Sequence, residues 1–244
     1  MSDVYQKELV IRTSEADFTG CMRPSALLTA FQEAAEHHAV RLGCGFEEMM
    51  ARRQAWVLTR FQMEVRRYPR MGETVHLNTW PATGRRGIFP RYYTLTDVQG
   101  SVLAMASSLW VVLDLDTRRM TAPGEIAELM PDNSAIQPPL ALPGGVRQIE
   151  GEEEICFREP AYSDLDVNGH VNNARYVDWM CDALGIERQR KAALGSLLIG
   201  YSKEVLPGQR ICLKLHRSGE QFSFQGEQDG KVHFECRGAW MERI

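Results

Sequence analysis

The sequence predicts an α+β fold that is built twice from the same parts, each copy being a long helix wrapped by an antiparallel sheet. Three observations predict it. A short sequence pattern recurs in both halves of the chain, each copy leads into an amphipathic helix, and strand-like segments follow each helix. The length of 244 residues suits one large or two small domains.

The recurring pattern occupies residues 17–35, which read DFTGCMRPSALLTAFQEAA, and residues 166–184, which read DVNGHVNNARYVDWMCDAL. The two stretches align without gaps, with Asp17 on Asp166, at an offset of 149 residues. The identities are few, but each copy has a similar place within its half of the chain. That placement indicates an internal repeat.

The first copy continues into a helix whose apolar stripe runs from Leu27 to Leu42. Pro24 suits the first turn of this helix, and Gly43 suits its C-terminal end. Apolar segments rich in β-branched and aromatic residues then predict the strands of the first sheet. They cover residues 56–66, 73–80, 88–96 and 102–113.

The second copy predicts a helix with a stripe from Ala174 to Leu184, ended by Gly185. The strands predicted after it cover residues 197–205, 209–215, 221–227 and 231–240. Within them, ICLKL and KVHFEC alternate apolar and polar residues, as half-buried antiparallel strands do. Between the copies, residues 131–150 hold four of the eleven prolines and a Gly-Gly pair. We therefore expect an N-terminal domain over 1–130, a linker over 131–150 and a C-terminal domain over 151–244.

The composition excludes several classes of function. A net charge of −4 does not suggest nucleic-acid binding, and no apolar run is long enough to span a membrane. The N-terminus lacks the pattern of a signal or transit peptide, and the six cysteines are scattered without a C-x-x-C pair. These features predict free thiols in the cytoplasm. His37 and His38 have no third ligand at metal spacing, so we expect helix-surface packing or solvation for them and expect no metal site.

A polar cluster precedes the second helix. Asp164, Asp166, Asn168 and His170 fall within seven residues of a loop that feeds a helix N-terminus. Acids, an amide and an imidazole in this setting can perform acid–base chemistry and stabilise an anion. The spacing fits equally well a polar turn with an Asn cap and a solvated histidine. The residues alone leave both interpretations open.

Three separated segments resemble one family. DLDVNGHVNNARYVDWM at 164–180, residues 52–80 and ASSLWVVLDLDTRRM at 106–120 are similar to acyl-acyl-carrier-protein thioesterases of the plant and bacterial type. The resemblance covers nearly the whole chain and implies two tandem hotdog domains. It also implies hydrolysis of the thioester of fatty acyl-acyl-carrier-protein, releasing free fatty acid, with no metal or organic cofactor.

Position by position, Asp166, Asn168 and His170 match the family's polar active-site cluster. Glu204, in YSKEVLPG, matches a family glutamate proposed to activate water. The next position holds a cysteine in the plant enzymes and Val205 here, which argues against a cysteine nucleophile. The first copy has Thr19 and Cys21 at the positions of Asn168 and His170. The resemblance therefore implies that the first domain is degenerate and shapes the acyl pocket and the carrier-protein contacts.

Thioester hydrolysis needs an activated water, a polarised carbonyl group and a leaving thiolate. Glu204 and Asp166 are both candidate bases, and the sequence does not choose between them. His170 can share that role, and Asn168 can hold the water or the carbonyl oxygen. The N–H groups that open the helix after His170 are the expected oxyanion donors.

An excess of arginine suggests a docking face for the acidic carrier protein with its phosphopantetheine-linked acyl chain. Residues 52–91 contain nine arginines and only two acids. A solvated strand face with ion pairs elsewhere explains the same composition. The docking candidates are Arg66, Arg67, Arg70, Arg85 and Arg86.

The alternatives to this function are an acyl-CoA thioesterase on the same fold and a non-catalytic acyl-binding protein. The fold is widely reused, so function rests on the site. An acyl chain needs an apolar channel, which some of the five tryptophans would line. Acyl chain length and oligomeric state stay open, including a homodimer.

Overall fold

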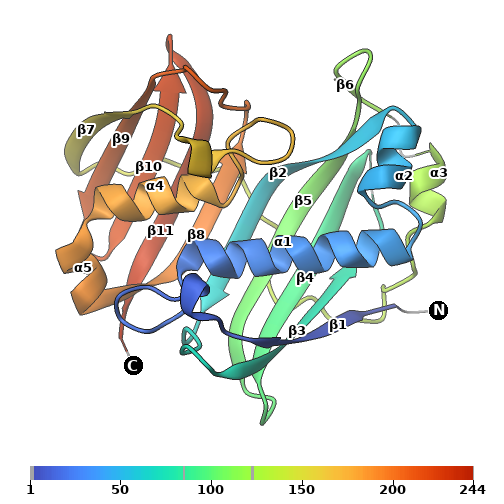
Figure 1. Cartoon of the computed structure of the whole chain (residues 1–244), viewed down its shortest axis with the longest axis horizontal. Helices are drawn as coiled ribbons and strands as arrows, with labels where there is room; N and C mark the ends of the chain where they lie inside the picture. The colour runs from blue at the N-terminus through green and yellow to red at the C-terminus, as the bar shows by residue number, and fades with distance from the viewer. Residues whose placement is uncertain (1–2, 85, 122–123, 244) are drawn as a thin grey trace. The chain divides into compact units, whose positions relative to one another are not determined.

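The computed structural model of the chain describes residues 3–84, 86–121 and 124–243. Its contacts divide into two units: unit 1 comprises residues 1–23 and 27–143, and unit 2 comprises residues 144–244 with residues 24–26. Each unit combines one main helix with an antiparallel sheet (Figure 1). The predicted α+β class is therefore confirmed.

Unit 1 contains the strands β1 to β6, the helices α2 and α3, and all of α1 except its first three residues. Its sheet has the order β1–β3–β4–β5–β2, with β6 paired to β5. The helix α1 lies across one face of this sheet (Figure 1). The elements are β1 (Tyr5–Val10), α1 (Pro24–Arg41), α2 (Phe46–Ala51), β2 (Gln54–Val65), β3 (Thr74–Pro81), β4 (Ile88–Asp97), β5 (Val102–Asp114), β6 (Arg119–Met120) and α3 (Gly124–Glu128).

The predicted apolar stripe makes the core of unit 1. Pro24 is the first residue of α1, and Gly43, with φ of +75°, follows its C-terminal end. Phe31 on the buried face of α1 contacts the rings of Phe61 on β2 and Tyr93 on β4, at centroid distances of 6.2 and 5.1 Å. All three rings are fully buried, so this contact anchors the helix to the sheet.

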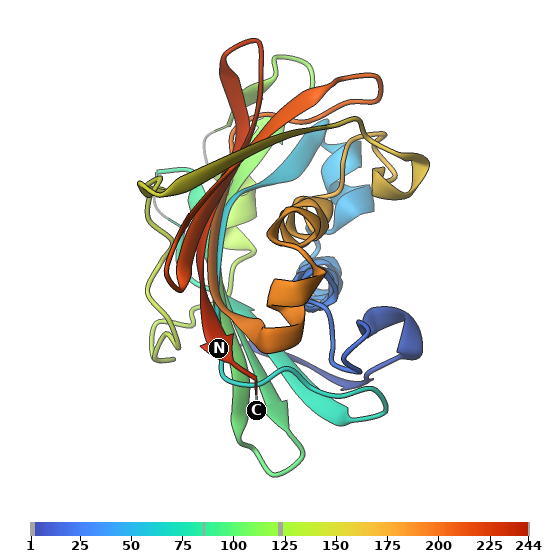
Figure 2. The same cartoon turned by 90° about the vertical axis from the view of Figure 1, so that its left-hand side faces the viewer.

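Unit 2 has the sheet order β8–β11–β10–β9–β7. In Figure 2 its main helix α4 (orange) is seen nearly end-on, on one side of the red strands. Tyr176 and Trp179 of α4 contact Phe234 of β11 and form its aromatic core. The elements are β7 (Glu152–Arg158), α4 (Arg175–Leu184), α5 (Ile186–Lys191), β8 (Ala192–Tyr201), β9 (Ile211–Ser218), β10 (Gln221–Gln228) and β11 (Lys231–Glu242).

Two glycines of unit 2 lie directly beneath aromatic rings. Gly226 on β10 pairs with Phe234 on β11, and a Cβ atom on this glycine would overlap the ring of Phe234. Gly238 on β11 pairs with Phe222 on β10, and its Cβ atom would overlap the ring of Phe222. Both positions require glycine because the ring occupies the space of a side chain.

The strand predicted over 197–205 is wrong in its placement. β8 begins at Ala192 and ends at Tyr201, so Glu204 lies in the turn that follows the strand. The prediction also missed β1 and β7, which are the outermost strands of their sheets within each unit. Residues 131–150 contain neither helix nor strand. Asn133 nevertheless is buried and donates to Pro81 O at 2.9 Å.

Candidate active site

A tight loop ahead of α4 is organised by the Asp166 carboxylate. Its Oδ1 accepts the N–H groups of Asn168 at 2.8 Å and His170 at 3.2 Å. The Asp166 N–H donates to His170 O at 2.8 Å, and Gly169, with φ of +76°, donates to Asp166 O at 3.0 Å. One carboxylate oxygen of Asp166 is thus committed to holding the loop, as in an Asx turn.

Backbone contacts bring this loop to the turn that carries Glu204. Val171 forms a β-bridge with Leu165, and its N–H donates to Val205 O at 3.0 Å. As a result His170 Nε2 lies 3.4 Å from Glu204 Oε2. The two side chains are 31% and 38% exposed, so water can reach the pair. The structure therefore joins the two residues, which are 34 positions apart in the sequence.

His233 stabilises the turn that carries Glu204 through its ring and its carbonyl group. Its Nδ1 lies 2.9 Å from Glu204 O, and its own carbonyl oxygen accepts the N–H groups of Ser202 and Lys203. Burial lowers the pKa of His233, so the ring stays neutral and donates its Nδ1 hydrogen to the Glu204 carbonyl. His233 is a positioning residue that sequence reasoning missed. The alternation in KVHFEC places it on one face of a strand but gives no sign of its partner.

The other members of the polar cluster have different environments. The Asn168 side chain is exposed, and among the described residues it makes no hydrogen bond, so it is available to water or substrate. Asp164 is buried; its Oδ2 accepts the Ala161 N–H at 2.8 Å, and its Oδ1 lies 3.8 Å from Arg158. Asp164 therefore stabilises the loop and does not face solvent.

The structure reduces the number of N–H groups that are free to act as oxyanion donors. The N–H groups of residues 171, 172, 174 and 175 already donate to protein oxygen atoms at 2.8–3.0 Å. That of Asn173 has no acceptor among the described residues. The turn before α4 therefore uses most of these N–H groups itself, and oxyanion binding stays a prediction for the others. The N–H groups of Asn173 and Tyr176, neither of which has an acceptor among the described residues, remain the candidates.

Unit 1 contains the same loop with different side chains. Asp17 Oδ1 accepts the Thr19 N–H at 2.8 Å, and the Asp17 N–H donates to Cys21 O at 2.8 Å. The Met22 N–H then donates to Pro69 O at 2.8 Å, as Val171 does to Val205. The residue before the accepting carbonyl is Tyr68 in unit 1 and Glu204 in unit 2. The loop of unit 1 therefore has neither a histidine nor a carboxylate at the positions that matter.

The docking candidates differ in their surroundings. Arg66, Arg70 and Arg86 are exposed. Arg67 makes two hydrogen bonds to the Glu73 carboxylate, at 2.9 and 2.6 Å, so its charge is largely compensated. Arg85 lies outside the described residues. Arg91, which the arginine count included, is buried and does not face a partner.

The cysteines are free thiols, and Val205 is fully buried. Burial raises the pKa of Cys44 to about 11 and also raises the pKa values of Cys156 and Cys236, so these groups stay protonated and weakly nucleophilic. Within residues 3–84, 86–121 and 124–243, no three His, Cys, Asp or Glu side chains gather as a metal site would require.

Comparisons with known proteins agree across both halves of the chain. The N-terminal domain model of acyl-ACP thioesterases matches residues 2–129, and the C-terminal domain model matches residues 149–242. The chloroplastic palmitoyl-acyl carrier protein thioesterase of Cuphea hookeriana is 30% identical over 214 residues, which cover 82% of this chain and 52% of that protein. The chain thus spans about half the length of the curated relatives it matches.

Two solved structures share the fold. An acyl-ACP thioesterase from Bacteroides thetaiotaomicron matches with a TM-score of 0.87 at 22% identity, covering 98% of each chain. The 12:0-ACP thioesterase from Umbellularia californica matches with a TM-score of 0.82 at 24% identity, again covering 98% of each chain. This likeness confirms the predicted tandem hotdog fold. The two domain models, which match residues 2–129 and 149–242, show that the chain belongs to the acyl-ACP thioesterase family.

Proposed function

We propose that this chain hydrolyses the thioester of fatty acyl-acyl-carrier-protein and releases free fatty acid and carrier protein. The observation that carries the proposal is the His170–Glu204 pair, at 3.4 Å and open to water, in a chain of a family of thioester hydrolases. An imidazole beside a carboxylate is a suitable pair for taking a proton from water. The proposed reaction uses no metal or organic cofactor.

In the proposed mechanism, Glu204 and His170 together take a proton from a water molecule whose oxygen attacks the acyl carbon. The carbon–sulfur bond breaks, and the phosphopantetheine sulfur leaves as a thiolate, which is stable because thiols have a pKa of about 8.5. Asp166 acts by holding the loop, since its Oδ1 already accepts two N–H groups. The Asn168 amide and the Asn173 N–H are the proposed donors to the carbonyl oxygen.

Unit 1 is proposed to contribute the acyl pocket without chemistry of its own. Its loop repeats the backbone of the catalytic loop but carries Thr19 and Cys21, with Tyr68 on the adjoining turn. A pocket lined largely by apolar side chains lies within this unit, with Trp56, Phe89 and Trp110 in its wall. Such a lining suits a hydrocarbon chain.

The proposal is tested by hydrolysis of matched substrates. Acyl-acyl-carrier-proteins and acyl-CoAs of the same chain lengths are incubated with the purified chain, and the released thiol and fatty acid are measured. We expect faster release from the carrier protein. Preference for the CoA esters would indicate an acyl-CoA thioesterase, and acyl binding without release would indicate a binding protein.

The arginine-rich segment is proposed to help dock the carrier protein. We expect Arg66→Glu combined with Arg70→Glu to raise the apparent KM for acyl-acyl-carrier-protein, because both exposed guanidinium groups would attract an acidic partner. The effect should be much smaller for a short acyl thioester without the protein. It should also shrink at high salt, since screening acts over about 8–10 Å at moderate ionic strength.

Arg119→Glu, an exposed change elsewhere in unit 1, is the matched control for this docking experiment. Equal effects of the double substitution on both substrates would assign these arginines to the fold or the acyl site. No effect on either substrate would place docking elsewhere on the chain.

We further propose that the chain works in the cytoplasm. The six free cysteines fit a reducing compartment, as scattered thiols do in intracellular proteins. In the part of the chain that the structure describes, no helix has both the length and the apolarity needed to cross a membrane. Fractionation of the native host cells, followed by immunodetection of the chain, tests this location.

A further inference from the structure

The pocket of unit 1 is apolar over most of its wall. Trp56 Nε1 donates to Cys44 O at 2.9 Å, and Trp110 Nε1 donates to Ser108 Oγ at 2.8 Å, so both indole groups have their polar atoms satisfied. Trp56 also packs edge-on against Phe89. The cavity measures about 60 Å³, which is room for about four water-sized groups. This is the size of the end of an alkyl chain with its terminal group.

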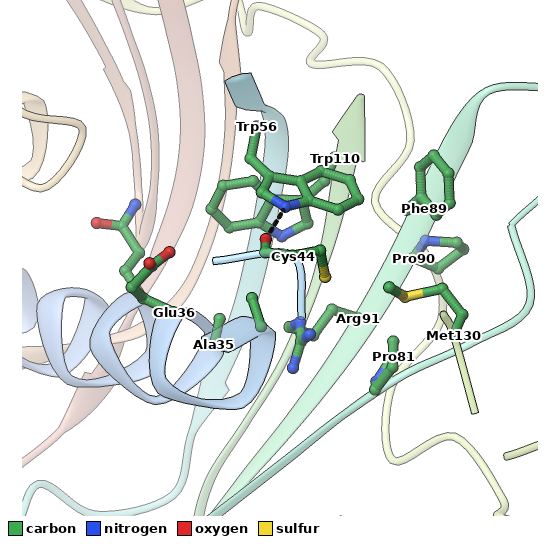
Figure 3. A pocket seen from close by; sticks show the side chains of 12 residues that line it. Ala35, Glu36, Cys44, Trp56, Pro81, Phe89, Pro90, Arg91, Trp110 and Met130 are labelled. Atoms are coloured by element: carbon green, nitrogen blue, oxygen red, sulfur yellow. Dashed lines mark hydrogen bonds between the residues drawn. The ribbon is translucent and has the colours of Figure 1, made fainter. Parts of the chain in front are cut away.

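A buried cation interrupts this apolar wall. Arg91 lines the pocket and is only 7% exposed (Figure 3). Its Nη1 contacts His38 Nδ1 at 3.2 Å and Thr79 Oγ1 at 3.3 Å. Among the described residues, no carboxylate lies within ion-pair distance of this guanidinium. An arginine keeps its charge in a protein, so a buried one without a counter-charge is costly.

Neighbouring groups fix Arg91 in this position without neutralising it. His38 is fully buried on α1, and burial together with the Arg91 charge lowers the pKa of His38 to about 4, so the ring is neutral. Because Nδ1 accepts from Arg91, the ring hydrogen is on Nε2, which lies 3.5 Å from Asp3 Oδ2. The expectation of helix-surface packing or solvation is therefore wrong for His38, whose ring supports the buried cation.

The acids around this cation are engaged elsewhere. Asp3 lies at the opposite nitrogen of the His38 ring and pairs with Arg41 at 3.2 Å. Glu36 lines the pocket from α1, but it is exposed, and one of its carboxylate oxygens accepts a main-chain N–H at 2.8 Å. Figure 3 draws this carboxylate away from the Arg91 guanidinium. The charge of Arg91 is therefore left without a counter-charge at contact distance.

One edge of the Arg91 guanidinium is unoccupied. Its Nε and Nη2 have no hydrogen-bond acceptor among the described residues, yet they are not sealed from solvent as the unpaired Gln32 Nε2 is. Because Arg91 is buried and lines the pocket, this remaining access is from the cavity. Nε and Nη2 form the edge with which Arg53 holds the Asp116 carboxylate, at 3.2 and 2.6 Å. The free edge is thus suited to a carboxylate.

We propose that this pocket binds a carboxylate carried on an alkyl chain, held at the Nε and Nη2 edge of Arg91. The carboxylate supplies the missing counter-charge, and its two oxygen atoms match the two parallel N–H donors. The wall that contains Trp56, Phe89 and Trp110 suits the methylene groups that follow. A neutral end group would leave the buried charge unpaired.

Such a carboxylate has two chemical sources in the proposed thioester hydrolysis. One is the far end of the acyl chain, when the substrate is a half-thioester of a dicarboxylic acid. The other is the free fatty acid that the proposed reaction releases. The choice between these sources rests on the proposed function, whereas binding of the carboxylate at Arg91 does not.

Equilibrium binding to the full chain tests the site without using the hydrolytic reaction. The probes are straight-chain alkanoates from butanoate to dodecanoate and the amides of the same lengths, titrated at pH 7 by calorimetry. The amide has the shape of the carboxylate without its charge. We expect the alkanoate to bind about tenfold more tightly than its amide, or more, at the best length, the scale of a hydrogen bond to a charged group.

Two variants locate this preference. Arg91→Met removes the cation, and Gln32→Glu adds a carboxylate to the wall of the same pocket with little change in shape. Each should lower the alkanoate-to-amide affinity ratio toward one. Arg119→Met and Gln99→Glu, which are exposed changes outside the pocket, are the matched controls and should leave the ratio unchanged. If Arg91→Met fails to fold, Gln32→Glu decides, because Gln32 is only partly buried.

Equal affinity for alkanoate and amide in the wild type at every length would overturn the proposal and leave Arg91 to bind water. A preference for the alkanoate that is unchanged in the folded pocket variants would also overturn it, because the carboxylate would then bind elsewhere on the chain.

Hydrolysis assays identify the source of the carboxylate. Faster release from carrier-protein half-thioesters of dicarboxylic acids than from matched monocarboxylic thioesters, lost in Arg91→Met, would assign the site to the far end of the acyl chain. Competitive inhibition by alkanoates, lost in the same variant, would assign it to the released fatty acid. Alkanoate binding at Arg91 without hydrolysis of any thioester would overturn the proposed hydrolytic function alone. Hydrolysis by a chain that binds alkanoate and amide equally would overturn this inference alone.

Discussion

We expect His170→Ala and Glu204→Ala each to lower the turnover number for acyl-acyl-carrier-protein by on the order of 100-fold or more, the usual scale for an acid–base group. The reason is that His170 Nε2 and Glu204 Oε2 meet at 3.4 Å and are the proposed pair that activates water. The backbone of both turns is held by main-chain hydrogen bonds, so the variants should fold. Thiol release by folded variants, checked by circular dichroism, measures the effect.

A second histidine–glutamate pair of unit 2 provides a matched control. His216 Nε2 lies 3.4 Å from Glu153 Oε1, the same separation as in the proposed catalytic pair. His216→Ala and Glu153→Ala should leave the turnover number close to wild type. Near wild-type rates for both His170→Ala and Glu204→Ala would contradict the site assignment. An acyl-cysteine trapped during turnover would replace the water mechanism with a covalent one.

The largest stability effect is expected where Phe234 covers Gly226. Phe234→Ala removes a fully buried ring that contacts Tyr176 and Trp179, and should cost about 3–5 kcal/mol. Gly226→Ala pushes a methyl group into that ring and should cost about 1–3 kcal/mol. The double variant should lose less unfolding free energy than the sum of the two single losses. The space left by the Phe234 ring can accommodate the methyl group that Gly226→Ala introduces. Urea midpoints of the full chain measure these changes.

The neighbouring pair of Phe222 and Gly238 supplies the control for this coupling. Phe222→Ala combined with Gly226→Ala should be additive, because the ring of Phe222 covers Gly238 and not Gly226. A similar coupling free energy for Phe234→Ala with Gly226→Ala and for Phe222→Ala with Gly226→Ala would mean that the strands β10 and β11 rearrange together. Strict additivity for Phe234 and Gly226 would show that the ring moves aside at little cost.

The sequence predicted the central elements of each unit better than the edges. Helix α1 and the strands β2 to β5 have apolar patterns because they are packed on the core. The edge strands β1 and β7 were missed because they look polar; β7 begins with three consecutive glutamates. The Glu152–Arg158 segment is a strand because its backbone pairs with β9. The two strands are distant in the sequence, so no local pattern reveals this pairing.

The residues of the candidate site also differ in how far the sequence predicted them, according to whether their contacts are local or distant. The loop from Asp166 to His170 is local, so its spacing alone predicted either an acid–base cluster or a polar turn, without choosing between them. Glu204 was identified only through resemblance, because it is brought to His170 by one backbone hydrogen bond from Val171 to Val205. His233 was missed because its role depends on the turn it supports. Arg91 was counted with surface arginines because charge does not reveal burial.

The loops at Asp17 and Asp166 share one backbone arrangement, and this bears on how the sequence of such a chain can evolve. In both, an aspartate, a glycine and main-chain hydrogen bonds form the frame, while the side chains of Asn168 and His170 in the second copy make none of these hydrogen bonds. A copy can therefore carry other side chains at these positions and keep the same backbone, as the first does with Thr19 and Cys21. The reverse should also hold. The substitutions Cys21→His and Tyr68→Glu should place a histidine and a glutamate on the loop of unit 1 without a change in its backbone.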